Sequence, residues 1–145
     1  MIRLRRILCA IDKSRCSMDA LAYAEYFALK NSAELHLLYV IDTRHFDDFP
    51  PFEFPGPESA TVKRIKDELA ANVSDEIKSK VKVVMTVVVG IPVQKILSIS
   101  RQRYIDLIVL GTHGRTGMAR AVMGSVAANV LKKAKCPVLT VRQSD

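Results

Sequence analysis

The sequence lacks several residue patterns that mark common classes of protein. Its three cysteines, at positions 9, 16 and 136 of 145 residues, form no CxxC pair, so neither a disulfide framework nor a zinc site is supported. The apolar runs are short and interrupted, and none is long enough to span a bilayer. Residues 1–6 lead directly into a strand-like run without a signal-peptide core. We therefore expect a cytoplasmic protein with no membrane partner.

Glycine is also scarce, and its six positions exclude two familiar phosphate-binding motifs. No Gly-Lys pair occurs in the chain, which excludes the P-loop. The turn after the first expected strand, residues 12–15, has no glycine, which excludes the usual dinucleotide-binding fingerprint. Four of the six glycines lie instead between residues 111 and 124.

The overall composition is that of a globular protein. Hydrophobic residues make up 49% and charged residues 26% of the chain, so we expect a single domain over residues 1–145 with a substantial core. The net charge of +7 suits an anionic partner such as a phosphate. The basic residues are scattered and no nucleic-acid reading element is recognisable, so we do not expect nucleic acid to be that partner.

Apolar runs alternate with helical periodicity along the chain. Strands are expected at residues 7–11, 35–41, 81–89, 107–110 and 138–141. One helix is expected to start near residues 14–17, and three more are expected to span about 59–79, 92–104 and 125–134. This alternation predicts a Rossmann-like α/β fold, an open five-stranded parallel sheet with helices on both faces. Ligands bind such folds at the carboxyl ends of the strands. The first, second and fourth strands therefore line one crevice if the first and fourth are neighbours.

The segment from Asp42 to Pro57 interrupts this alternation. It contains four prolines, one glycine and four phenylalanines, so regular structure is not expected there. Long loops inside compact domains are usually functional or disordered. The phenylalanines leave three roles open, namely packing against the rest of the domain, covering a site as a lid, and contacting a partner.

The glycine-rich stretch from Gly111 to Ser125 predicts a phosphate site. It begins where the apolar run Leu107–Leu110 ends, and it stops where a new helical pattern starts. Glycine lets backbone N–H groups approach a ligand closely, and a helix N-terminus favours an anion. The alternative is a connection between strand and helix that binds nothing.

The spacing G-x2-G-x9-G-[ST], formed by Gly111, Gly114, Gly124 and Ser125, resembles the ATP-binding branch of the universal stress protein family. Residues 6–14, 38–42 and 135–141 resemble the same family in the same order. The resemblance implies the adenine nucleotide alpha hydrolase-like fold and a homodimer formed by pairing the last strand across a two-fold axis. It also implies ATP as the ligand, with AMP or ADP as alternatives, together with Mg²⁺.

Carried over position by position, the resemblance implies two groups of phosphate-site residues. Gly111 and Gly114 would pass beneath the ribose and phosphates. Gly124, Ser125 and Val126 would present backbone N–H groups to the phosphates, and the Ser125 hydroxyl would join them.

The same resemblance implies that Asp12 faces the ribose or the metal-phosphate end, and that the Val40 backbone meets the adenine edge. Lys13 departs from the family, which often has glycine there, and it either alters the turn or adds a cation directed at the phosphates. The place of Cys16 near the first turn is compatible with an accessible thiol, although no reactive role is expected. We expect His113 to face solvent, with donation to a phosphate as the alternative.

Groups suited to catalysis are sparse in the sequence. Asp12 is the only acid expected near the site, and no nucleophile–base pair or paired carboxylates are visible. We therefore predict an ATP-binding regulatory protein of the stress response, with no catalytic residue and with metal ligands unassigned. Binding would bias a dimer surface or the Asp42–Pro57 loop toward an unidentified protein partner. Two alternatives stay open, a slow metal-dependent ATPase that uses Asp12 and a dimeric interaction module that binds no nucleotide.

Overall fold

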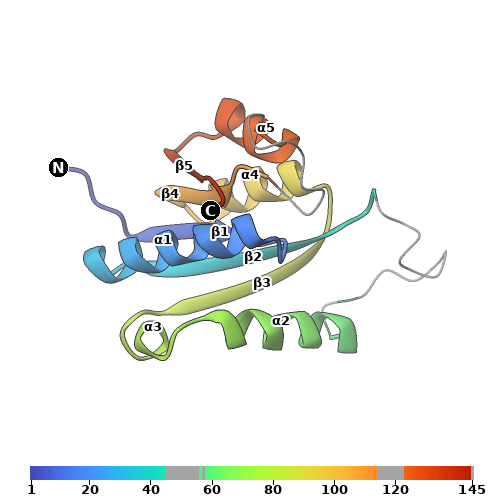
Figure 1. Ribbon diagram of the computed structural model, residues 1–145, viewed down its shortest axis with the longest axis horizontal. Helices are drawn as coiled ribbons and strands as arrows, with labels where there is room; N and C mark the ends of the chain where they lie inside the picture. The colour runs from blue at the N-terminus through green and yellow to red at the C-terminus, as the bar shows by residue number, and fades with distance from the viewer. Residues whose placement is uncertain (45–55, 57, 114–122, 145) are drawn as a thin grey trace.

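The computed structural model describes residues 1–44, 56, 58–113 and 123–144, and Figure 1 shows how the elements are arranged. In chain order these are β1 (Arg6–Ala10), α1 (Arg15–Asn31), β2 (Glu34–Asp42), α2 (Ala60–Asn72), α3 (Asp75–Lys80), β3 (Val83–Gly90), α4 (Pro92–Gln102), β4 (Leu107–Gly111), α5 (Ser125–Lys133) and β5 (Val138–Val141). The predicted alternation of strands and helices is confirmed.

The five strands form one sheet in the order β3-β2-β1-β4-β5, and every neighbouring pair is parallel. Successive β1 residues face opposite sides of this sheet. Ile7 and Cys9 belong to the core cluster that includes residues of α1, α2 and α3, whereas Leu8 belongs to the cluster that includes residues of α4 and α5. The fold is therefore the expected Rossmann-like α/β sandwich. Since β1 and β4 are neighbours, the condition for a crevice at their carboxyl ends is met.

The prediction of a single helix over residues 59–79 is wrong, because the helix is interrupted between α2 and α3. Val73 is extended, with ψ of 132°. Ser74 is the N-cap of α3, and its Oγ accepts a hydrogen bond from the Ile77 N–H at 3.3 Å. Val73 and Ile77 are both buried in the same core cluster. The apolar spacing thus continues across the break, and only the serine cap marks it.

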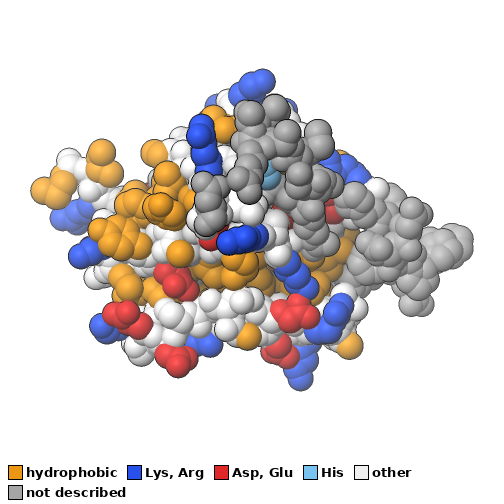
Figure 2. All heavy atoms as spheres, in the orientation of Figure 1, with side chains coloured by type: hydrophobic (Ala, Val, Ile, Leu, Met, Phe, Trp, Pro, Cys, Tyr) orange, Lys and Arg blue, Asp and Glu red, His pale blue; other side chains and the backbone are white. Residues whose placement is uncertain are grey.

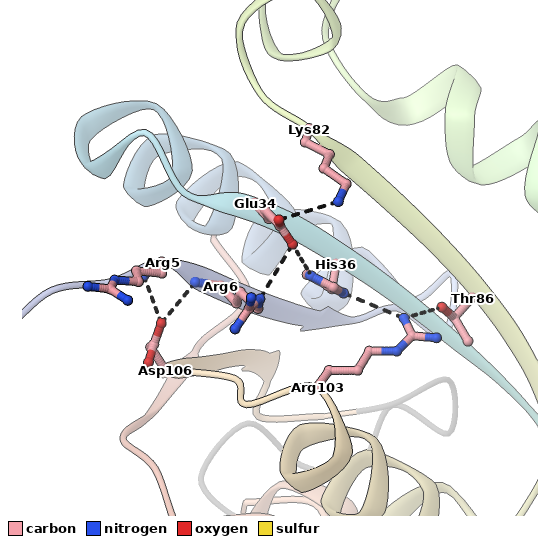
Figure 3. A network of polar contacts seen from close by, with 8 residues as sticks. All are labelled: Arg5, Arg6, Glu34, His36, Lys82, Thr86, Arg103 and Asp106. Carbon is pink, nitrogen blue, oxygen red and sulfur yellow. Dashed lines mark hydrogen bonds and ion pairs between the residues drawn. The ribbon is translucent and has the colours of Figure 1, made fainter.

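A polar network lies at the amino ends of the strands, away from the predicted crevice (Figure 3). His36 is 5% exposed. Its Nε2 lies 3.0 Å from Oε2 of Glu34, and its Nδ1 lies 3.5 Å from Nη1 of Arg103. Arg103 also donates to Oγ1 of Thr86 at 2.7 Å. Because a guanidinium can only donate, Nδ1 of His36 accepts and its Nε2–H donates to Glu34.

His36 makes the stability of the fold sensitive to acid. Burial lowers the pKa of His36, and the nearby Arg103 adds to this against the opposing effect of Glu34. The unfolded chain therefore takes up the proton first, and the free energy of unfolding falls as the pH drops below about 6.5. The loss is at most about 1.4 kcal/mol for each pH unit. Chemical denaturation at about pH 7.5 and about pH 5.5 spans this window.

The variant His36→Gln isolates this effect, because glutamine keeps a donor and an acceptor but does not titrate. We expect it to lose most of the stability difference between the two pH values. A difference as large as in the unaltered chain would contradict the assignment. Titration of Glu34 does not contribute to the difference in unfolding free energy between these two pH values. The hydrogen bond from His36 lowers the pKa of Glu34 and keeps it well below this pH range.

Candidate functional site

The carboxyl ends of β1, β2 and β4 meet at one edge of the sheet. Ala10 pairs with Leu38, and Cys9 pairs with Val109. Continuing this register places Asp12 level with Val40 of β2 and with Thr112, the residue after β4. The order of the strands reverses between β1 and β4, so this edge is the topological switch point at which α/β folds bind ligands.

Local hydrogen bonds fix Asp12 in the turn between β1 and α1. Its Oδ1 accepts from the N–H of Ser14 at 2.9 Å, and its own N–H donates to Oγ of Ser17 at 3.3 Å. Ser14 is the N-cap of α1, and its Oγ accepts from the N–H of Ser17 at 3.1 Å. The Asp-x-Ser sequence thus combines an Asx turn with a helix cap. Asp12 is held, half-buried, at the predicted edge.

Lys13 occupies the middle of this turn with φ of 67°. This left-handed conformation suits glycine and disfavours residues with a β-carbon. The Lys13 ammonium pairs with Glu68 of α2 and lies 5.4 Å from the centre of the Tyr39 ring. The turn at Lys13 therefore has the left-handed backbone conformation that glycine favours, and the lysine does not alter it. Its cation contacts α2, on the sheet face opposite α5.

The N-terminus of α5 lies against the end of β4. Gly124 is the N-cap, and its N–H donates to the Thr112 carbonyl at 2.6 Å. No side chain in the described ranges caps α5, whose first helical bond joins Ala128 N–H to the Gly124 carbonyl. Ser125 is exposed and Val126 is half-buried. The first-turn N–H groups therefore have no partner in the helix, as an anion site requires.

α1 packs closely against the end of β4 at Gly111. A β-carbon added at Gly111 would lie 2.8 Å from Sγ and 2.9 Å from the carbonyl carbon of Cys16. Cys16 is only 1% exposed, which rules out the accessible thiol that its place near the first turn had left open. Its Sγ donates to the Val141 carbonyl at 3.1 Å. The missing side chain of Gly111 admits Cys16, and this packing role was not predicted from the glycine spacing.

Thr112 and His113 follow β4 directly, and they are buried and half-buried, respectively. Thr112 is 5% exposed, its N–H donates to Val141, and its Oγ1 lies 3.0 Å from Nδ1 of His113. The Nε2 atom of His113 is buried and has no hydrogen-bond partner in the described part of the chain. The expectation that His113 faces solvent is therefore wrong for this nitrogen. The position of His113 directly after a buried strand was the feature of the sequence that could have indicated its partial burial.

The end of β2 carries a second carboxylate that sequence reasoning did not use. Asp42 accepts from Nε of Arg44 at 2.9 Å and from Nη2 at 2.7 Å. Val40 is half-buried and packs against the α4 side of the sheet. Among the described residues, no three His, Cys, Asp or Glu side chains are grouped closely enough to hold a metal ion. Gly114 and residues 45–55 and 57 lie outside the described residues.

Comparison with known proteins decides the family. The sequence profile of the Universal stress protein family matches residues 3–142. The chain belongs to this family. It is 30% identical to the universal stress protein MJ0577 of Methanocaldococcus jannaschii, over 99% of this chain and 98% of that protein. A solved structure of MJ0577 superposes with a TM-score of 0.72, covers 99% of both chains and is 29% identical.

Two further solved structures of the family contain nucleotides. One is a universal stress protein in complex with cAMP, which is 25% identical with a TM-score of 0.71 over 99% of this chain and 100% of that one. The other is the universal stress protein of Archaeoglobus fulgidus in complex with dAMP. It is 22% identical, with a TM-score of 0.63 over 97% and 99% of the two chains, and supports the fold alone. No helix in the described ranges is long and apolar enough to cross a membrane.

Proposed function

We propose that this universal stress protein binds an adenine nucleotide, ATP with Mg²⁺, at the carboxyl ends of β1, β2 and β4. One observation carries the proposal. The α5 N-terminus, uncapped by any described side chain, is held against β4 by the Gly124 N–H, at the same edge of the sheet as Asp12. Backbone N–H groups and the helix dipole favour phosphate at such a position.

Each element of the edge has a distinct role in this proposal. The N–H groups of Ser125 and Val126 and the Ser125 hydroxyl would receive the phosphates. The end of β4 at Gly111, with Gly114 beyond it, would pass beneath the ribose. The Val40 backbone would meet the adenine edge, since it is level with Asp12 on the neighbouring strand.

Asp12 needs a neutral or cationic neighbour in the complex, because a carboxylate repels phosphate. Its carboxylate would therefore accept from ribose hydroxyls or ligate Mg²⁺. Magnesium is commonly held by one or two carboxylates together with substrate phosphates and water. A single protein ligand is compatible with the absence of a three-residue metal cluster in the described ranges. When bound, Mg²⁺ would supply charge neutralisation to the triphosphate.

The relatives support an adenine nucleotide as the class of ligand, but they do not distinguish ATP from other adenine nucleotides. A family member that is 25% identical to this chain has been solved with cAMP, an adenine nucleotide. The preference for ATP over AMP, ADP or a cyclic nucleotide is proposed from the N-terminus of α5, which no described side chain caps and which can receive several phosphate oxygens.

We propose a regulatory role because the described residues of this edge offer few groups suited to catalysis. We expect one cytoplasmic domain over residues 1–145 that dimerises through β5, which pairs only with β4 among the described strands. The unpaired edge of β5 can add a second copy by backbone hydrogen bonding. Nucleotide occupancy would then alter the dimer surface or the Asp42–Pro57 loop presented to a protein partner.

Nucleic acid is not the expected partner. On the face shown in Figure 2, basic side chains are spread over many elements, and acidic side chains lie among them around α2 and α3. Binding to a nucleic-acid backbone instead favours a continuous basic surface.

The proposal is tested first on the purified, unaltered chain. Mass spectrometry of the denatured protein identifies any nucleotide that was retained, and calorimetry measures binding of ATP, ADP, AMP and cAMP with and without Mg²⁺. We expect ATP to bind most tightly with Mg²⁺ present. If no nucleotide is retained and none binds, the proposal fails and the chain is an interaction module.

The variant Asp12→Ala distinguishes binding from slow hydrolysis. If the chain is a regulatory binder, ATP stays intact over hours in both proteins. Turnover that is lost in Asp12→Ala while ATP still binds would establish the ATPase alternative instead.

A further inference from the structure

Lys13 connects the candidate nucleotide edge to α2, a helix that contributes no residue to the proposed site. Its backbone lies directly after Asp12, and its ammonium reaches Glu68 near the middle of α2. The hydrogen bond from Lys13 holds the pKa of Glu68 below its usual range. Tyr39 of β2 lies beneath the same ammonium. One side chain therefore joins the β1–α1 turn to two other elements.

The Lys13 side chain depends on these polar contacts for its position. It lies at the edge of a hollow of about 370 Å³ that Ile11, Met18 and Leu69 also line. The left-handed backbone at Lys13 is unfavourable for a residue with a β-carbon. Loss of the Glu68 and Tyr39 contacts would thus let the turn relax toward a commoner conformation.

We infer that the Lys13–Glu68 pair is a latch that supports the Asp12 turn, in addition to the Asx turn and the Ser14 cap, and transmits nucleotide binding to α2. This inference rests on the proposed function. If the latched turn binds nucleotide better than the relaxed turn, nucleotide must stabilise the latch to the same degree, because coupling between two sites is reciprocal.

The expected effects are modest because the two side chains are 39% and 40% exposed. Glu68→Gln should weaken ATP binding by about two- to fivefold, the range that an exposed ion pair supports. Lys13→Ala should weaken it more than Lys13→Gly does, because alanine keeps the unfavourable β-carbon after the tether is lost. Adding Glu68→Gln to Lys13→Ala should have little further effect, since the latch is already broken.

Hydrogen exchange supplies a readout that a local packing defect would not move. ATP should slow amide exchange in α2 of the unaltered chain, and this protection should disappear in Glu68→Gln. The matched control is Arg64→Gln, which removes the other ion pair of Glu68, at 3.8 Å, without touching the turn. It should leave both ATP affinity and α2 protection unchanged.

Each outcome bears on a different claim. If the unaltered chain binds no nucleotide, the proposed function and the latch both fail. If it binds ATP but Glu68→Gln binds equally well, the latch alone is overturned. Fully additive effects of Lys13→Ala and Glu68→Gln would also overturn it, as would α2 protection that persists in Glu68→Gln.

Discussion

Replacing Gly124 by alanine should weaken nucleotide binding by about tenfold or more, since a hydrogen bond to a charged group is worth about 1.5–3 kcal/mol. The cause is steric. A β-carbon at Gly124 would lie 2.9 Å from the Thr112 carbonyl oxygen, the same atom that accepts the Gly124 N–H at 2.6 Å. Both groups belong to the backbone, so no rotamer change relieves the contact. The first turn of α5 must move, and the N–H groups of Ser125 and Val126 move with it.

The chain should still fold when Gly124 is replaced, because overpacking typically costs about 1–3 kcal/mol of a total stability of about 5–15 kcal/mol. Calorimetry with ATP and Mg²⁺ measures the binding loss, and circular dichroism verifies the fold. Gly56→Ala is the matched control, since a β-carbon there would meet no atom within 4 Å. Unchanged affinity in Gly124→Ala would show that the α5 N-terminus does not hold the phosphates.

The fold was predictable because its signals are local. Each strand is a largely apolar run of strand length, and the longer helices α1, α2 and α4 repeat their buried residues at three- and four-residue spacing. The break between α2 and α3 was missed because Val73 and Ile77 continue that repeat, while Ser74 alone marks the new helix start. A single serine is a weak signal against a continuous apolar stripe, so the periodicity dominated the prediction.

The candidate site was only partly predictable, because several of its features depend on residues far apart in the sequence. The helical pattern after Gly124 correctly predicted a helix start at Ser125, and alternation placed Asp12 at the same edge of the sheet. The direction of Lys13 depends on Glu68, which lies on a helix that the sequence does not relate to the turn. The burial of Cys16 likewise depends on Gly111, and neither residue predicts the other.

Gly111→Ala should lower the stability of the fold, because Cys16 of α1 packs closely against Gly111 at the end of β4. The added β-carbon would lie 2.9 Å from the carbonyl carbon and 3.1 Å from the β-carbon of Cys16. Neither atom can rotate away, so α1 must separate from the end of β4. We expect a loss of about 1–3 kcal/mol in the free energy of unfolding. Thermal and urea denaturation would measure this, with a melting temperature lower by roughly 3–12 °C.

A second substitution identifies which contact causes the loss. Cys16→Ala removes the Sγ atom that lies 2.8 Å from the added β-carbon, but it leaves the Cys16 backbone in place. The double variant Gly111→Ala/Cys16→Ala should therefore recover only part of the lost stability. Complete recovery would mean that the helix backbone is farther from β4 than described. Partial recovery would establish that Gly111 is required to bring the Asp12 turn and the end of β4 together, before any ligand binds.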